Sequence, residues 1–236
     1  MRPTAVVSLA IALFACTAMA AAEPPKLSAA TTAAAAGMTN IRTLVPDIDE
    51  VIHYAMADNF TGAVVDGYEA PACYLRTAAA QALARVEAAL RTQGYRLRLW
   101  DCYRPARAVA AFVRWAGDLS DVRTKAAHYP NLGKDKLLGE YIAPVSGHSR
   151  GATVDLTLLR CDGATCLPLD MGTDFDFFDP LAHTDDPRIS ASQQANRQRL
   201  LRAMAAEGFV NYPLEWWHYS LPSAAPADLI YDVPVR

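Results

Sequence analysis

The chain has 236 residues, of which 52% are hydrophobic and 20% are charged, and its formal net charge is −3. This length is sufficient for one globular domain with a substantial core. The slight acidity gives no electrostatic reason to expect a nucleic-acid partner, because nucleic-acid-binding domains carry strongly basic surfaces.

The first 22 residues have the layout of a secretory signal. Arg2 supplies a positive charge, residues 6–15 form an apolar run, and Ala20-Ala21-Ala22 supplies the small residues of a cleavage site. The run is too short to span a membrane. We therefore expect removal of residues 1–22 and export to the periplasm or the medium. A lipid anchor at Cys16 is the disfavoured alternative, because the residue two positions before it is bulky for a lipoprotein box.

Residues 23–40 are rich in Ala, Thr and Pro and have low complexity. This composition predicts a flexible lead-in without core-forming residues. The remaining chain has no internal repeat and no second linker. We therefore expect residues 41–236 to form a single domain.

Several elements are predicted in chain order. Residues 77–93 keep helical spacing of apolar side chains, with Gly94 as the stop. Residues 95–101 alternate between apolar and polar side chains, which predicts a strand with one buried face. A second helix begins at Pro105. Three further elements follow: a strand at 154–158, a helix at 192–207 and a strand at 216–221. Because helices and strands do not alternate regularly, we predict an α+β fold, with a central, mainly antiparallel sheet flanked by helices.

Removal of the signal leaves four cysteines. An even number in an exported chain suggests disulfides. Cys161 and Cys166 flank a turn-like segment, so a local bridge is the simplest pairing, and Cys73 with Cys102 follows by elimination. A cysteine-rich zinc site is the competing interpretation, and the lack of any C-x-x-C pair disfavours it.

Two segments carry residues suited to metal chemistry, SGHSRGATVD at 146–155 and EWWH at 215–218. They hold two histidines and two carboxylates, and a zinc hydrolase needs three ligands and a separate base. A lone histidine is more often a surface or core residue. Asp155, however, lies in a strand that looks buried, where an unpaired charge is costly and a metal ion would satisfy it. Glu215 and His218 can converge only if Glu215 lies in a turn before the strand, since strand side chains alternate.

The segments SGHSRGATVDLTL and EWWHY resemble the metal-binding segments of the D-Ala-D-Ala dipeptidase family of zinc peptidases. The resemblance continues through ADNFTG, WDCYRPARAV, MGTDFDFFD and the closing YDVPVR, and it covers nearly everything from about residue 40 onward. Matches of this length and spacing are far more specific than an isolated His and Asp. The resemblance implies a zinc site in a cleft of the α+β domain.

Carried over position by position, the resemblance implies one Zn²⁺ per chain with the ligands His148, Asp155 and His218. It makes Glu215 the catalytic base and Arg104 the arginine that stabilises the transition state.

The resemblance also implies positions around a bound dipeptide, at Ser146, Tyr54 and Asp176. Asp176 would be the counter-charge of the substrate ammonium, or else a solvated loop carboxylate. Asp101 would orient Arg104 or pair with it structurally. His183 lies in a polar loop, and we expect it to be structural or exposed and not a ligand.

The implied activity is hydrolysis of free D-alanyl-D-alanine to two D-alanines, in peptidoglycan turnover or D-alanine salvage, or in depriving a glycopeptide antibiotic of its target. Residues 128–133 are turn-rich and could form a lid that narrows the site. One alternative is a zinc D,D-carboxypeptidase or endopeptidase acting on peptidoglycan peptides. The other is a non-catalytic zinc-binding wall-peptide module, which retention of Glu215 and Arg104 disfavours.

Overall fold

The structure is a computed structural model, and it describes residues 24–236. The expected signal peptide, its cleavage site and Cys16 lie outside the described residues. Within residues 24–236, no helix has the length and apolar character needed to cross a membrane.

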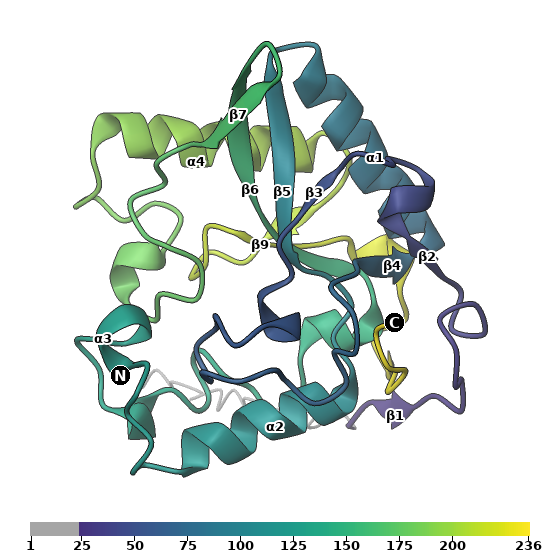
Figure 1. The fold of residues 1–236 in the computed structure, drawn as a ribbon, viewed down its shortest axis with the longest axis vertical. Helices are drawn as coiled ribbons and strands as arrows, with labels where there is room; N and C mark the ends of the chain where they lie inside the picture. Colours follow the sequence, from purple (N-terminus) through teal and green to yellow (C-terminus); the bar gives the residue numbers. More distant parts are fainter. Residues whose placement is uncertain (1–23) are drawn as a thin grey trace, which may run out of the picture.

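Helices and strands are mixed along the chain, and the predicted α+β class is confirmed (Figure 1). The helices are α1 (Thr77–Arg91), α2 (Ala106–Gly117), α3 (Lys125–His128) and α4 (Ala191–Ala205). The strands are β1 (Lys26–Leu27), β2 (Met38–Asn40), β3 (Asp49–Glu50), β4 (Tyr74–Arg76), β5 (Tyr95–Asp101), β6 (Thr153–Asp162), β7 (Thr165–Pro168), β8 (Val210–Asn211), β9 (His218–Ser220) and β10 (Leu229–Ile230).

The central sheet has the strand order β3-β5-β6-β9-β8, with β7 also paired to β6. β5 runs parallel to β3 and antiparallel to β6, and β6 runs antiparallel to β9. In this register Asp155 lies opposite Asp101 on one side and opposite His218 on the other. Directly paired residues point to the same face of a sheet, so the register alone gathers these three side chains.

The two faces of the sheet have different roles. Leu97 and Leu99 of β5 pair with Leu158 and Leu156 of β6, and all four are buried on the face covered by α1 and α4 (Figure 1). Asp155 points to the other face, because side chains alternate along a strand. The apolar face therefore anchors the sheet, and the opposite face is free to carry polar groups.

The residues predicted as a flexible lead-in are instead paired with the rest of the domain. β1 pairs with β10, and β2 pairs with β4. Ala36 and Met38 are buried in the core. The prediction of a lead-in without core-forming residues is therefore wrong for residues 24–40, because their partners lie far along the chain and leave no local periodicity.

The last residues of the chain brace the segments that follow β5 and precede β6. The Tyr231 amide donates to the Ser149 carbonyl at 2.9 Å, and the Val233 amide donates to the Tyr103 hydroxyl at 2.7 Å. Tyr231 and Val233 are themselves buried.

The structure contains the two disulfides that the sequence suggested, Cys73–Cys102 and Cys161–Cys166. Cys161–Cys166 closes the β6–β7 hairpin, which projects at the top of Figure 1. Cys73–Cys102 is buried in the core.

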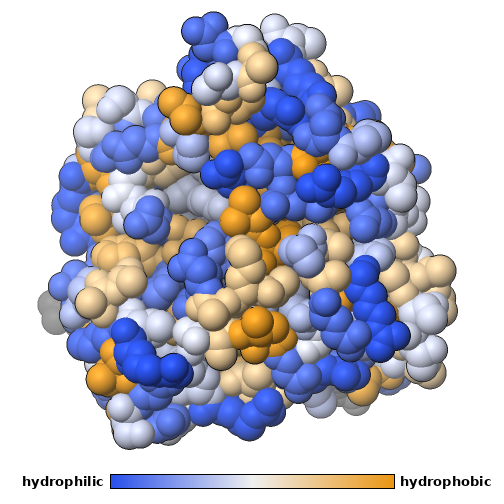
Figure 2. Space-filling view, viewed as in Figure 1, coloured by the Kyte–Doolittle hydropathy of each residue, from blue (hydrophilic) through white to orange (hydrophobic). Residues whose placement is uncertain are grey.

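Figure 2 shows hydrophobic side chains gathered near the middle of one face of the molecule and hydrophilic ones over most of its rim.

Candidate active site

His148 lies in a single 3-10 turn, Gly147–Arg150, immediately before β6. The Ser146 side chain caps this turn by accepting a hydrogen bond from the His148 amide at 3.2 Å. Gly151 ends it in the left-handed conformation, with φ of 77°, which favours glycine. The SGHSRG segment therefore folds into a capped turn that points His148 toward the polar face of the sheet.

Glu215 lies in a turn before β9, as convergence with His218 requires. The Glu215 amide donates to the Tyr212 carbonyl at 3.0 Å, and the His218 amide donates to the Glu215 carbonyl at 3.2 Å. The Asn211 side chain donates to the carbonyls of both Glu215 and His218. A carboxylate oxygen of Glu215 consequently lies 3.4 Å from His218 Nδ1.

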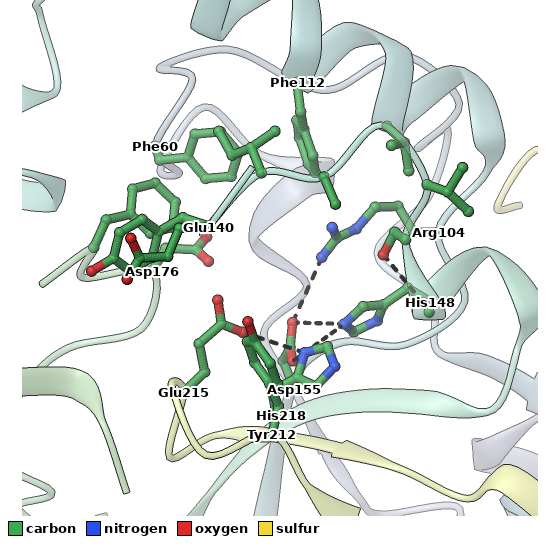
Figure 3. A pocket seen from close by; sticks show the side chains of 18 of the residues that line it. Phe60, Arg104, Phe112, Glu140, His148, Asp155, Asp176, Tyr212, Glu215 and His218 are labelled. Carbon is green, nitrogen blue, oxygen red and sulfur yellow. Dashed lines mark hydrogen bonds and ion pairs between the residues drawn. The ribbon is translucent and has the colours of Figure 1, made fainter. Parts of the chain in front are cut away.

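Metal-ligand atoms of three side chains, His148, Asp155 and His218, come together in the cavity (Figure 3). His148 Nε2 lies 3.2 Å from Asp155 Oδ2 and 3.3 Å from His218 Nδ1. His218 Nδ1 lies 3.0 Å from Asp155 Oδ1. Ligands bound to a tetrahedral zinc ion at about 2.0–2.1 Å are about 3.3 Å apart, so these separations fit such an ion.

The chemistry of the donors also fits a cation. Asp155 Oδ1 is buried and accepts no hydrogen bond from residues 24–236, although His218 Nδ1 is near, as expected if both atoms face a common ion. His148 Nδ1 lies 2.7 Å from the Cys102 carbonyl oxygen. A carbonyl can only accept, so Nδ1 carries the proton and Nε2 offers its lone pair.

Arg104 lies beside this cluster and is held by Asp101. Its Nε atom donates to Asp101 Oδ2 at 3.0 Å, and its Nη2 atom lies 2.9 Å from the same oxygen and 3.7 Å from Asp155 Oδ2. The Tyr68 hydroxyl donates to the other Asp101 oxygen at 2.6 Å. Asp101 is fully buried behind Arg104 and does not line the cavity, so it orients the guanidinium and is not placed to touch a substrate.

The cluster opens into a cavity of about 290 Å³. Phe60, Phe112 and Phe178 form part of its wall. The rings of Phe60 and Phe112 lie across the cavity from Glu215 and His218 (Figure 3). A volume near the lower end of the range for ligand pockets suits a small molecule.

Asp176, Tyr54 and Ser146 all line this cavity. Asp176 is only 6% exposed, so the interpretation of a solvated loop carboxylate is wrong. The Tyr54 hydroxyl donates to it at 2.9 Å, and burial raises the pKa of Asp176 well above its ordinary value. Asp176 also has a φ of 55°, a left-handed conformation in which aspartate and asparagine are enriched.

Other predicted positions lie elsewhere. His183 does not line the cavity, and its carbonyl accepts a hydrogen bond from Arg197. Residues 128–133, expected as a lid, do not line the cavity either. Residues of the segment 139–147 form a wall of the cavity instead. Glu140, Tyr141 and Tyr212 also line the cavity, but they have no distinguishing pattern in the sequence that predicts this position.

Glu215 has a pKa that is shifted toward neutrality. Burial raises its pKa to about 7; His218 acts to lower it and the nearby Asp155 acts to raise it. A carboxylate with a pKa near the working pH can both accept and return a proton. Burial also acts on Asp155, but its two imidazole neighbours hold the pKa of that carboxyl well below its ordinary value, so it is ionised.

Comparison with known proteins agrees with this arrangement. A family model described as peptidase M15, D-Ala-D-Ala dipeptidase, matches residues 34–236. The chain belongs to this family. The matched region contains all the cavity-lining residues of the site.

Members with curated names are similar over most of their length. A D-alanyl-D-alanine dipeptidase of Streptomyces coelicolor is 44% identical, over 77% of this chain and 90% of that protein. One of Enterococcus faecium is 41% identical, over 80% and 96%. One of Escherichia coli is 33% identical, over 83% and 90%. The peptidase M15 family, together with the buried histidine and aspartate donors, makes the chain a metallopeptidase.

Proposed function

We propose that this protein hydrolyses the free dipeptide D-alanyl-D-alanine to two D-alanines in a zinc-dependent reaction. The observation that carries the proposal is the convergence of three metal-ligand side chains, a largely buried glutamate and a largely buried arginine on one small cavity. The names of its family and of its relatives, D-alanyl-D-alanine dipeptidases, support the choice of substrate.

His148, Asp155 and His218 would hold the zinc ion. Bound there, zinc would supply Lewis-acid polarisation of the scissile carbonyl and a lowered pKa of a water molecule. Glu215, 3.4 Å from His218, is the group that takes the water's proton as the new C–O bond forms. It returns a proton to the leaving amine as the C–N bond breaks. The Arg104 guanidinium donates hydrogen bonds to the oxyanion that forms between these events, and Asp101 keeps it in place.

Substrate selection follows from size and charge. Asp176, with Tyr54, offers a buried carboxylate for the free ammonium group of a dipeptide, and Ser146 offers a hydroxyl near His148. A longer peptide presents a neutral amide where the ammonium would lie and needs more room than a 290 Å³ cavity provides. Steric exclusion and the loss of the ion pair between Asp176 and the ammonium group would both act against it.

The biological setting follows from the amino-terminal sequence. A secretory signal supports action outside the cytoplasm, whereas peptidoglycan precursors are made inside it. We therefore favour salvage of D-alanine from peptidoglycan turnover over depletion of an antibiotic target. Intact mass of the mature protein, measured with and without reductant, would test signal cleavage, a lipid on Cys16 and both disulfides.

The decisive experiment feeds equal concentrations of free D-alanyl-D-alanine and of a muropeptide pentapeptide to the purified protein, with zinc content measured on the same sample. We expect one zinc per chain and release of D-alanine from the dipeptide alone. The Glu215→Gln variant, which keeps the zinc ligands, is the control for contaminating activity. Preference for the pentapeptide would instead assign a D,D-carboxypeptidase, and zinc binding without turnover of either substrate would assign a binding module.

A further inference from the structure

The Cys102 carbonyl that accepts the His148 proton lies just past the end of β5. Asp101 is the last β5 residue paired with β6, and the register between the two strands already shifts between Leu99 and Asp101. The hydrogen bonds of the central sheet therefore stop one residue before this carbonyl. Something other than the sheet must fix its position.

The segment that fixes it is the one around β4. The Cys73–Cys102 disulfide joins the two segments covalently, and the Tyr103 amide donates to the Tyr74 carbonyl at 2.9 Å. Cys73 itself is anchored, since its carbonyl accepts from the Ile41 amide at 3.0 Å. Both half-cystines are almost completely buried, with exposures of 0% and 1%.

His148 contacts this fixed segment at two points. Its ring Nδ1 donates to the Cys102 carbonyl at 2.7 Å, and its own carbonyl accepts from the Arg104 amide at 3.3 Å. The partner of the second nitrogen of a ligating histidine sets the tautomer and orientation of the ring. A displaced Cys102 would release the ring and favour the competing acceptor Asp101 Oδ2, which lies 3.4 Å from Nδ1.

We propose that the Cys73–Cys102 disulfide is a positioning element of the metal site: it holds the carbonyl that orients His148, so that removing this one bond weakens metal binding in a protein that is still folded. This inference rests on the proposed zinc site. Loss of such a partner of a ligating histidine typically lowers metal affinity by about 10- to 100-fold.

The chain supplies its own matched control. Cys161 and Cys166 are directly opposite each other in the β6–β7 hairpin, at the end of β6 remote from Asp155. Removing that bridge deletes one disulfide from the same protein and leaves the segment carrying Cys102 untouched. A third variant, Cys73→Val with Cys102→Ala, refills the buried volume without the covalent bond and so separates packing from cross-linking.

The test measures zinc affinity by competition with a chromophoric chelator at 25 °C, with folding verified by circular dichroism and thermal unfolding. We expect about 10- to 100-fold weaker zinc binding in Cys73→Ala/Cys102→Ala and near-wild-type affinity in Cys161→Ala/Cys166→Ala. The Cys73→Val/Cys102→Ala variant should regain the melting temperature of the wild type but not its zinc affinity. If the double alanine variant does not fold, the Val/Ala variant takes its place in the comparison. Saturating zinc should restore most of the activity.

Equal zinc affinity in all variants, or an equal loss in both disulfide deletions, would overturn the positioning role. Recovery of zinc affinity together with melting temperature in the Val/Ala variant would do the same, because packing would then account for the effect. Failure of the wild-type protein itself to bind zinc would refute the proposed function, so the two failures are distinguishable.

Discussion

Replacing Glu215 by glutamine should inactivate the enzyme and, at the same time, stabilise its metal-free form. Folding raises the pKa of this carboxyl from its ordinary 4.5 to about 7 because the side chain is buried, with only 13% exposed. An acid with a raised pKa is destabilising wherever it is ionised. The cost is absent below pH 4.5, grows as the pH rises, and is complete above about pH 7.

The size of the cost follows from the two pKa values. A rise from 4.5 to about 7 corresponds to about 3 kcal/mol in the free energy of unfolding at pH 8, and to about 1 kcal/mol at pH 5. Glutamine has nearly the same shape and no charge, so the variant should gain these amounts. Its activity with zinc should fall by about 10²- to 10⁴-fold, the usual contribution of a general base.

The assay is urea unfolding of chelator-treated wild-type and Glu215→Gln protein at pH 5 and pH 8, followed by turnover of D-alanyl-D-alanine by the zinc-loaded forms. Glu140→Gln is the matched control, since Glu140 lines the same cavity but is exposed, and it should change stability little at either pH. A Glu215→Gln protein that is less stable than wild type at pH 8, or that retains activity within about threefold, would refute the reasoning.

Three further outcomes are expected. His148→Ala should lose tight zinc binding and activity together. Chelation of wild-type protein should lower its melting temperature, because zinc at a thousand times its Kd contributes about 4 kcal/mol to the free energy of unfolding. An unchanged melting temperature after complete zinc removal would contradict the site. Asp176→Asn keeps a residue type that tolerates φ of 55° and removes the carboxyl group that can ionise opposite the substrate ammonium. The KM for the free dipeptide should therefore rise by at least about tenfold, with a smaller change in kcat, in steady-state kinetics. An unchanged KM would remove Asp176 from ammonium binding. Arg197 is completely buried and donates to the carbonyls of Met171, Leu181 and His183. Arg197→Met should therefore lower the free energy of unfolding by about 3 kcal/mol in urea titrations. A loss below about 1 kcal/mol would show that water replaces the guanidinium as the donor to these carbonyls.

The elements predictable from the sequence are those that carry their own periodic pattern. α1 shows three apolar residues at helical spacing, and β5 alternates over seven residues. β1, β3, β8 and β10 have two residues each, which is too short for any period to register. β1 and β3, like the three-residue β2, also depend on partners distant in the chain. The composition of residues 24–40 therefore predicts a flexible segment although these residues are paired.

The candidate site also has features that the sequence predicts and features that it does not. The side-chain types at 146–155 and 215–218 indicated a metal site, and the turn at Pro213 left room for Glu215 to converge with His218. The alignment of Asp155 between Asp101 and His218, however, is set by the register of three strands. The wall at 139–147 is set by how an irregular segment packs, and nothing in its composition predicts which side chains face inward.

The bracing of Ser149 and Tyr103 by Tyr231 and Val233 has a consequence for when this enzyme becomes active. Protein synthesis delivers the chain from its amino terminus, and contacts between distant segments form last. A nascent chain that still lacks residues 229–236 has no partner for β1 and lacks the hydrogen bond from Tyr231 to the turn that carries His148. Assembly of the hydrolytic centre is thereby tied to synthesis of residues 229–236.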